Sequence, residues 1–528
     1  MTPDKAQGIS FSSLDVAVGT PATRIALAQA AREPFYLSAR NLLVLVFLLI
    51  IFAITCRPII DPDFWWHLKT GQYLFETRTI PHTDIFSAIF AGREWVTHEW
   101  LSEVFIYAVY RISGLGGLIV SFSLIVTAAF ALIYKRCADR ANHVYVAGAS
   151  VLLGSLAMGP TMGVRPQIFT FLLAGIFLKL LEDFQKDGSA RRIWLLVPLM
   201  AIWVNLHAGF GAGIVIIVVF IAGISIEKLM KRQSLPEIWR GIRSLLVVFV
   251  ACLAAIVFNP NGVRIYSYPF ETLTSTAMMR FIEEWRSPNF HQAMFQPLAL
   301  LIVAVVAALA LSRRMISAVQ LLLLIGTAWA MLRSGRNVPF FVLVATPLLA
   351  ERAWSWMSNQ RWARSAKKSK PDLSNDKLKL VLNILLLLVI PMALVVVRAR
   401  QTLADQSAVE AQKFPGAGME FIRANKLPQP LYNEYHWGGY LIWKLYPDYK
   451  VFIDGRADVY GDAFFEQFMA AHAGEPGWRE TLTKYHVRTV LVAPDSAIAS
   501  LLRQDQSWKK VFEDTQAVIF VNSQSLSN

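Results

Sequence analysis

The sequence has few cysteines and few charged residues for its length. Three of its 528 residues are cysteines, and Cys56, Cys137 and Cys252 all lie in or at the ends of apolar runs. This placement excludes a disulfide framework in the polar parts, and no cysteine spacing fits a metal site. Charged residues make up 17% of the chain and apolar residues 55%. Such a balance excludes a string of ordinary soluble domains.

The sequence also lacks the short motifs of several common enzyme classes. It contains no GxGxxG, no GxxxxGK[ST] and no HExxH, so nucleotide binding and zinc-protease chemistry have no support. No long internal repeat is visible. The net charge of +14 comes from basic residues that cluster in short loops between apolar runs. Because this clustering sets topology in a bilayer, we expect a lipid bilayer and no nucleic acid among the partners.

Long apolar runs dominate the rest of the chain. Many are long enough to cross the ~30 Å hydrocarbon core as helices, which indicates a polytopic α-helical membrane protein. We expect about eleven transmembrane helices, at 41–57, 116–134, 144–160, 166–182, 193–206, 209–227, 244–258, 297–312, 316–332, 338–352 and 379–397.

Loop charges predict which helix ends share a side of the membrane. Basic residues gather in the loops after the second, fourth, sixth and eighth spans and around 361–370. The positive-inside rule makes these loops cytoplasmic. Loops 58–115 and 259–296 and the chain after about 398 then face outward. Residues 1–40 are expected to form a cytoplasmic tail before an uncleaved first helix in a transmembrane domain over 41–398.

Two outward segments are expected to be folded. In loop 58–115, apolar positions at helical spacing predict interfacial amphipathic helices over 64–77 and 98–112, joined by a turn region with Pro81 and Gly92. Residues 399–528 have a water-soluble composition in which helical and strand patterns alternate, and we predict a small C-terminal α/β domain there. Its helices are expected at 416–426 and 496–503 and its strands at 450–453, 489–492 and 517–521.

Asp61 and Asp63 open the first outward loop. Such a pair can bind a divalent cation, Mg²⁺ or Mn²⁺, through its carboxylate oxygens. Alternatively, one carboxylate can act as a general base when burial tunes its pKa, or the pair can belong to a solvated loop in which Asp63 caps a helix. His67, His98, Glu99 and Glu103 lie on or beside the two expected helices, and their spacing could bring them to one cleft with the acidic pair. We expect His67, His98 and Glu99 to bind substrate there.

Arginines at the outward ends of helices form a second group. Arg165 lies in Gly-Val-Arg-Pro, and Arg333 and Arg336 occupy the turn between the ninth and tenth spans. An outward arginine runs against the topological bias, and a guanidinium fork that matches a phosphate would explain it. The alternative is contact with ordinary lipid headgroups. His207 lies in a further outward turn, Asn-Leu-His-Ala-Gly, and completes the expected substrate-binding set.

In the C-terminal domain, Glu434, Asp454 and Arg456 lie in two stretches rich in polar and aromatic side chains, 433–440 and 452–458. They could contact an acceptor or close over the membrane cleft. Equally, they could form a turn and a strand-end salt-bridge network.

The layout resembles the GT-C class of polytopic glycosyltransferases, which take sugars from polyprenyl-phosphate carriers. The resemblance covers most of the chain: an acidic motif and two interfacial helices in the first outer loop, about eleven membrane helices and a C-terminal outer domain. Several segments are similar to bacterial membrane proteins grouped with the dolichyl-phosphate-mannose mannosyltransferase and RgtA/B/C/D-like sets. They are DPDFWWHLKTGQYL, WVTHEWLSE, VRPQIFTF, NLHAGF, NPNG, RNVPFF and GGYLIWKLYPDYKVFIDGRADVYG.

The resemblance implies an inverting hexosyl- or pentosyltransferase in a bacterial inner membrane, with the C-terminal domain in the periplasm. It would move a sugar from a polyprenyl-phosphate donor to a glycan, lipid or protein acceptor. Asp61 would activate the acceptor hydroxyl, and Asp63 would assist or hold a metal. Arg165, Arg333 or Arg336 would neutralise the departing lipid phosphate. The last domain lacks the motifs of members that glycosylate lipid A or asparagine, so the acceptor stays open.

Two other classes are weighed against this expectation. A transporter or flippase of lipid-linked substrates predicts ionisable residues in mid-helix and repeated halves, whereas the apolar runs are nearly free of central charges. A non-catalytic membrane scaffold predicts that Asp61 can be replaced without loss of function.

Overall fold

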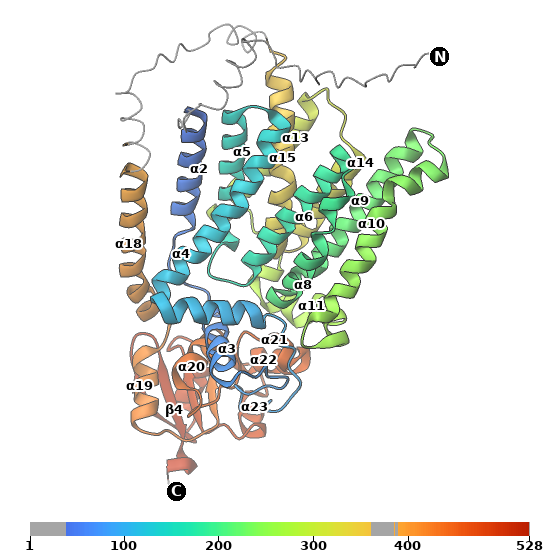
Figure 1. Cartoon of the computed structure of the whole chain (residues 1–528). Helices are drawn as coiled ribbons and strands as arrows, with labels where there is room; N and C mark the ends of the chain where they lie inside the picture. The colour runs from blue at the N-terminus through green and yellow to red at the C-terminus, as the bar shows by residue number, and fades with distance from the viewer. Residues whose placement is uncertain (1–38, 361–384, 386–388, 527–528) are drawn as a thin grey trace, which may run out of the picture.

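The structure is a computed structural model that describes residues 39–360, 385 and 389–526. Figure 1 shows long helices standing side by side, with a smaller C-terminal domain at one end of the bundle. We call this the domain end. Each of the first ten expected spans coincides with a helix of the bundle. These helices are α2 (Ala39–Thr55), α4 (Trp100–Ala141), α5 (Val144–Ala157), α6 (Gln167–Asp187), α8 (Leu196–Leu206), α9 (Gly211–Met230), α10 (Leu235–Ala255), α13 (Gln296–Leu311), α14 (Ala318–Arg333) and α15 (Val338–Met357).

The bundle has the surface of a membrane protein. Four helical stretches, within α4, α9, α10 and α13, are long and apolar enough to cross a membrane, and three shorter apolar helices accompany them. Val250, Val303 and Val306 are more than half exposed on the bundle, and such apolar surface is stable only when lipid covers it. The chain is therefore a membrane protein. Of the expected span 379–397, residues 379–384 and 386–388 lie outside the described residues and the last part belongs to α18 (Ile390–Lys413), so the count of about eleven stays a prediction.

The loops that were expected on the same side of the membrane lie at the same end of the bundle. Loops 58–115 and 259–296 lie at the domain end, and the described basic loops lie at the opposite end (Figure 1). The second outward loop carries the short helices α11 (Tyr268–Thr274) and α12 (Thr276–Phe281). At the start of α12, Ser275 donates a 2.6 Å hydrogen bond to Asp462 of the C-terminal domain. The basic stretch 361–370 and the tail 1–38 lie outside the described residues.

The two helices expected in the first outward loop are present. One is α3 (Phe64–Thr77), and the other is the first part of α4, which lies across the base of the bundle (Figure 1). The chain turns from this part into the membrane-spanning part at Gly114, whose φ of 64° and ψ of −163° are not helical. A glycine is needed there because other residues adopt this backbone conformation only with strain. The turn holds α3 and the start of α4 against each other beneath the bundle.

The C-terminal domain contains a four-stranded sheet in the order β1-β2-β4-β3. β1 and β2 are parallel, and the other two pairings are antiparallel. The strands are β1 (Leu431–Asn433), β2 (Thr489–Val492), β3 (Trp508–Glu513) and β4 (Val518–Asn522), and the helices are α19 (Gly416–Ala424), α20 (Gly438–Leu445), α21 (Ala457–Tyr460), α22 (Asp462–His472), α23 (Trp478–Lys484) and α24 (Ala497–Gln504). α18 (Ile390–Lys413) crosses the expected domain boundary at 398 and leads into this domain.

Four of the five elements predicted in this domain are confirmed, as α19, β2, α24 and β4. The strand predicted at 450–453 is wrong. This buried stretch does not join the sheet, because its backbone pairs with the first outward loop instead: Val451 N–H donates to the Phe86 carbonyl at 3.1 Å, and its carbonyl accepts from Ala88 N–H at 2.8 Å. The sequence pattern therefore identified a buried extended segment but not its partner.

Candidate active site

Arg165 binds two carboxylates at the domain end of the bundle. It lies just before the first turn of α6, where the following Pro166 disfavours a helical backbone. Its Nε forms an ion pair with Asp61 Oδ2, and its Nη1 donates a 2.6 Å hydrogen bond to Glu284 Oε2. The structure thus brings Asp61 and Arg165 together, which the sequence analysis placed in two separate groups. Glu284 was not predicted, because an acidic residue in loop 259–296 has no distinguishing local pattern.

Asp63 lies beside this ion pair without a close partner. Its Oδ2 is 4.0 Å from Arg165 Nη2, and it stands at the N-cap of α3 without making a capping hydrogen bond. Asp61, in contrast, uses both oxygens, since its Oδ1 accepts the Asp63 backbone N–H at 3.0 Å. Burial and then the charge of Asp61 raise the pKa of Asp63 to about 8. Asp63 is therefore the carboxylate that is free to exchange a proton near neutral pH.

Arg336 supplies a second positive charge to the site. It follows α14, its Nε lies 3.5 Å from Glu284 Oε1, and its guanidinium lies 4.6 Å from the ring centre of Trp285. Burial would raise the pKa of Glu284, but Arg165 and Arg336 outweigh it and lower the pKa to about 2. Arg333 lies apart from this cluster: it is exposed and contacts Met279 and Trp329.

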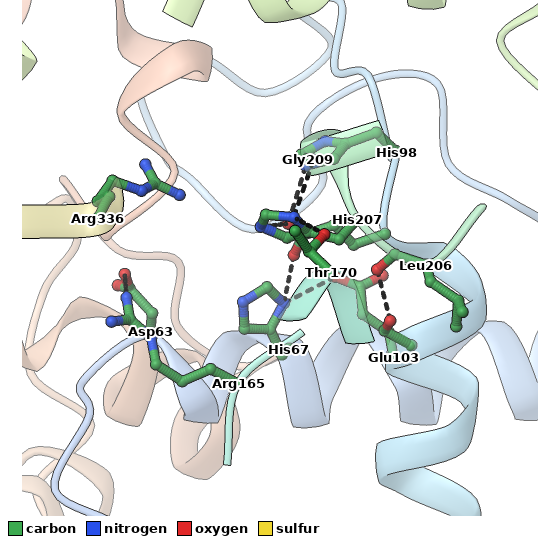
Figure 2. Close-up of polar contacts among 12 residues, drawn as sticks. Asp63, His67, His98, Glu103, Arg165, Thr170, Leu206, His207, Gly209 and Arg336 are labelled. Atoms are coloured by element: carbon green, nitrogen blue, oxygen red, sulfur yellow. Dashed lines mark hydrogen bonds and ion pairs between the residues drawn. The ribbon is translucent and has the colours of Figure 1, made fainter. Parts of the chain in front are cut away.

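Three histidines surround the carboxylate of Glu99. His98 Nε2 lies 3.0 Å and His207 Nε2 3.5 Å from Glu99 Oε1, while His67 Nδ1 lies 3.6 Å from Glu99 Oε2. Figure 2 shows this cluster beside Asp63, Arg165 and Arg336. The structure thus brings together the histidines and Glu99 that the sequence predicted. Glu103, expected from its spacing in the same cleft, joins them: its Oε1 lies 3.2 Å from His67 Nδ1.

The C-terminal domain packs directly on Asp63. A Cβ added to Gly455 would overlap Asp63 Oδ1, and one added to Gly439 would lie 2.5 Å from the Pro62 carbonyl oxygen. Tyr435 lies near the same carboxylates: burial and then the charges of Asp63 and its neighbours raise the pKa of Tyr435 well above its usual value. Tyr435 is a candidate site residue that was not singled out from the sequence, because an aromatic residue in a soluble domain is more often part of its core.

The three residues predicted as acceptor or lid contacts bind other parts of the protein. Arg456 donates to Asp454 and, at 2.7 Å, to Asp84 of the first outward loop, and all three are buried. Glu434 accepts the Ala493 N–H at 3.0 Å and lies 3.1 Å from His472 Nε2. These contacts favour the salt-bridge interpretation over the acceptor-contact one.

Solved structures share this architecture. The oligosaccharyltransferase of Archaeoglobus fulgidus, tethered to an acceptor peptide containing the NVT sequon, matches with a TM-score of 0.51 and 12% identity over 93% of this chain and 75% of that chain. The chain shares the fold of this structure. AglB of A. fulgidus, in complex with an inhibitory peptide and a dolichol-phosphate, matches with a TM-score of 0.49 and 11% identity, over 93% of this chain and 75% of that one. ArnT from Cupriavidus metallidurans, bound to undecaprenyl phosphate, matches with a TM-score of 0.45 and 14% identity, over 96% and 99%. No family model and no curated protein matches the chain.

A metal ion is predicted at Asp61 and Asp63. Arg165 approaches both carboxylates, with its Nε paired to Asp61 Oδ2 and its Nη2 4.0 Å from Asp63 Oδ2, and supplies the positive charge that an ion there would bring. Across the described residues, no cluster of three or more histidine, cysteine, aspartate or glutamate side chains is arranged to hold a metal ion. As arranged here, the residues do not fit the ion, and Mg²⁺ or Mn²⁺ at this pair stays a prediction.

Gly455→Ala is expected to lower turnover about a hundredfold, because displacing a reacting group by about 1 Å can cost that much. The added Cβ would overlap Asp63 Oδ1 and lie 2.6 Å from its Cγ. Gly416→Ala is the matched control, since a Cβ there meets open space at the start of α19. Initial rates and melting temperatures of both variants check this. Equal activity of the two would show that the contact with Gly455 does not position Asp63.

Proposed function

We propose that the chain is a membrane glycosyltransferase that moves a sugar from a polyprenyl-phosphate donor to a glycan, lipid or protein acceptor. The observation that carries the proposal is one free carboxylate, Asp63, beside two arginines at the membrane end where the soluble domain packs. Transfer needs a base for the acceptor hydroxyl and positive charge for the departing phosphate. The resemblance to GT-C glycosyltransferases and the fold shared with the A. fulgidus oligosaccharyltransferase support this reaction class.

In the proposed reaction, the acceptor hydroxyl attacks the anomeric carbon as the bond from that carbon to the phosphate oxygen breaks. The proton passes to Asp63, and polyprenyl phosphate leaves with the electron pair, so one displacement inverts the anomeric centre. The family resemblance implied that Asp61 is the base. The contacts favour Asp63, because Asp61 is held by Arg165 and by the Asp63 backbone N–H.

Arg336 is the proposed phosphate contact. The charge of Arg165 is balanced by Asp61 and Glu284 through close contacts. Arg336 has Glu284 as its carboxylate neighbour at 3.5 Å and makes no hydrogen bond within the described chain, so its donors can bind a substrate oxygen. Figure 2 shows its guanidinium facing the side of the site where His67 and His207 lie.

We further propose that the domain end faces the periplasm of a bacterial inner membrane, where lipid-linked sugars and their acceptors meet. The positive-inside distribution of the loop charges supports this orientation. Labelling of single cysteines introduced at exposed positions of the C-terminal domain, in intact cells with a membrane-impermeant reagent, tests it.

The first test of function uses purified protein in nanodiscs with a panel of radiolabelled polyprenyl-phosphate sugars and a crude membrane extract as acceptor. Release of free polyprenyl phosphate by the wild type, and not by Asp63→Asn, supports the proposal and identifies the donor. Folded protein that releases nothing from any donor would overturn it in favour of a transporter, flippase or scaffold.

Arg336→Gln is expected to raise the KM for the lipid-linked donor about ten- to a hundredfold, because a hydrogen bond to a charged group contributes about 1.5–3 kcal/mol. Arg333→Gln is the matched control, since Arg333 is exposed and lies apart from the carboxylates. Steady-state kinetics with the identified donor measure both. Similar effects of the two variants would assign the arginines to general lipid contact.

A further inference from the structure

His67 makes its polar side-chain contacts through one ring nitrogen. Nδ1 lies 3.2 Å from Glu103 Oε1 and 3.6 Å from Glu99 Oε2. Within the described part of the chain, Nε2 makes no hydrogen bond. Figure 2 shows the opposite ring edge turned toward the side of the site where Asp63, Arg165 and Arg336 lie. What His67 can do to a substrate there depends on whether Nε2 carries a proton.

The contacts of His98 determine its own protonation. Its Nδ1 lies 3.1 Å from the Val96 carbonyl oxygen and its Nε2 3.0 Å from Glu99 Oε1. A carbonyl and an ionised carboxylate both accept hydrogen bonds, so each nitrogen carries a proton and His98 is a cation. Burial opposes this charge, but Glu99 outweighs it and raises the pKa of His98.

The contacts of His207 determine its state in the same way. Its Nδ1 accepts the Gly209 backbone N–H at 2.9 Å, so this nitrogen carries no proton. The remaining proton is on Nε2, 3.5 Å from Glu99 Oε1. Burial lowers the pKa of His207 to about 4, and the ring is neutral. Glu99 Oε1 therefore faces two donors, one of them charged, which hold the pKa of Glu99 well below its usual range even though burial alone would raise it.

Glu99 and Glu103 are two buried carboxyl groups that approach the same nitrogen of His67. Glu103 is 1% exposed, and burial and then the negative charge of Glu99 raise its pKa well above its usual value, which Arg456 from the C-terminal domain only partly opposes. In the described chain no lysine or arginine lies within ion-pair distance of Glu103, and Glu99 approaches the same His67 nitrogen. Because a buried charge without a partner is costly, these contacts favour the protonated carboxyl. Glu103 Oε2 has no hydrogen-bond partner, so the acceptor within reach is His67 Nδ1, opposite Oε1. In the usual pairing the histidine N–H donates a hydrogen bond to a carboxylate; here the carboxyl group donates and the histidine nitrogen accepts.

We propose that Glu103 is a positioning residue whose protonated carboxyl donates to His67 Nδ1 and thereby keeps His67 neutral, with its proton on Nε2. His67 then presents an N–H to an oxygen of the lipid-linked sugar in the cleft. The charged and titratable groups that face Glu103 are His67 of α3, Glu99 before α4 and Arg456 of the C-terminal domain. This inference rests on the proposed function for its substrate, whereas the tautomer of His67 rests on the burial and contacts of Glu103.

Two variants test whether the side chain at position 103 acts as a hydrogen-bond donor or as a negative charge. Glu103→Gln can still donate to Nδ1 through its amide and is expected to retain most of the transfer activity. Glu103→Ala removes the donor, and its kcat/KM is expected to fall about tenfold or more. Wild type is expected to lose activity at alkaline pH, where Glu103 ionises, and Glu103→Gln to lack that loss. A merely structural role would not change the pH profile in this way.

A second measurement needs neither activity nor a variant of Glu103. Nitrogen-15 NMR of histidine-labelled wild type, with the His67 signals assigned by their loss in His67→Asn, reports which ring nitrogen is protonated. A neutral ring with the proton on Nε2 is expected. A proton on Nδ1, an imidazolium, or equal damage in the two Glu103 variants would overturn the inference. If no lipid-linked sugar supports transfer, the NMR result still decides the tautomer of His67. Failure of the proposed function can therefore be told apart from failure of this inference.

Discussion

Asp63→Asn is expected to lower kcat by about 10²- to 10⁴-fold, the contribution of a positioned general base. Asparagine has nearly the same shape but cannot accept the proton of the acceptor hydroxyl. Because the base must be ionised, kcat/KM of the wild type is expected to rise with pH through the pKa of Asp63, about 8. Initial rates over pH 6–10 measure this limb, which Asp63→Asn should lose.

Asp61→Asn is the informative companion variant. The charge of Asp61 raises the pKa of Asp63, so removing it should move the ascending limb to lower pH. Turnover is expected to fall as well, since Arg165 loses its partner at Asp61 Oδ2. Two results would assign the base role to Asp61 instead. In one, the rise of kcat/KM with pH stays at the same pH in Asp61→Asn; in the other, it disappears in Asp61→Asn but not in Asp63→Asn.

The stability of Asp63→Asn separates loss of chemistry from loss of fold. The folded-state pKa of Asp63, about 8, lies above the unfolded value of about 3.9, so the folded state binds more protons between them. Wild-type stability should therefore fall as pH rises through this window, and Asp63→Asn should lose that dependence. The variant is expected to melt at a higher temperature than the wild type above pH 8. A lower melting temperature there would contradict the burial of an ionised Asp63.

Local sequence patterns predicted most of the fold. The spans, α3, the start of α4 and most elements of the C-terminal domain follow from apolar periodicity, which is a local property. Val451 shows the limit: an extended buried segment gives the same pattern whether it pairs with a sheet or with a distant loop. The order of these segments, helices with two outward loops followed by a C-terminal domain, agrees with the fold shared with the A. fulgidus oligosaccharyltransferase, although the identity is only 12%.

The candidate site was predictable in part, for a physical reason. Asp61, Arg165 and the histidines stand out because polar residues at the ends of membrane helices need a partner. Glu284 and Tyr435 do not stand out, since their role depends on which loops pack together. The exchange of roles between Asp61 and Asp63 depends on which carboxylate Arg165 binds, and two residues of one type in one motif do not reveal that.

The C-terminal domain packs directly on residues of the candidate site. Gly455 packs on Asp63, and Tyr435 lies near the same carboxylates. The Trp65 ring on α3 lies edge-on to Phe414 and Tyr440 of the domain, with ring centres 5.8 and 4.9 Å apart. The domain therefore packs on the candidate site itself, and its attachment to the first outward loop should be needed for turnover.

Arg456→Met is expected to destabilise the protein by about 3–5 kcal/mol, the cost of leaving buried charges without their partner. Arg456 is 2% exposed, donates to Asp454 and Asp84, and stacks 4.6 Å from the ring centre of Trp95. Without it, two carboxylates that join the domain to the first outward loop stay buried and unneutralised. Thermal unfolding in detergent and limited proteolysis of loop 58–99 measure the loss.

Arg479→Met is the matched control for this variant. Arg479 also pairs with an aspartate, at 2.7 Å from Asp505, and lies 4.6 Å from the ring centre of Trp478, but its side chain is 64% exposed. Exposed ion pairs contribute about 0–1 kcal/mol, so this variant should melt close to the wild type. Combining Arg456→Met with Asp84→Asn and Asp454→Asn should recover part of the stability, because no buried charge then lacks a partner. Equal melting temperatures of Arg456→Met and Arg479→Met would show that the buried ion pairs of Arg456 with Asp84 and Asp454 do not hold the domain on the loop. The packing of the domain on the site would then depend on the aromatic contacts of Trp65.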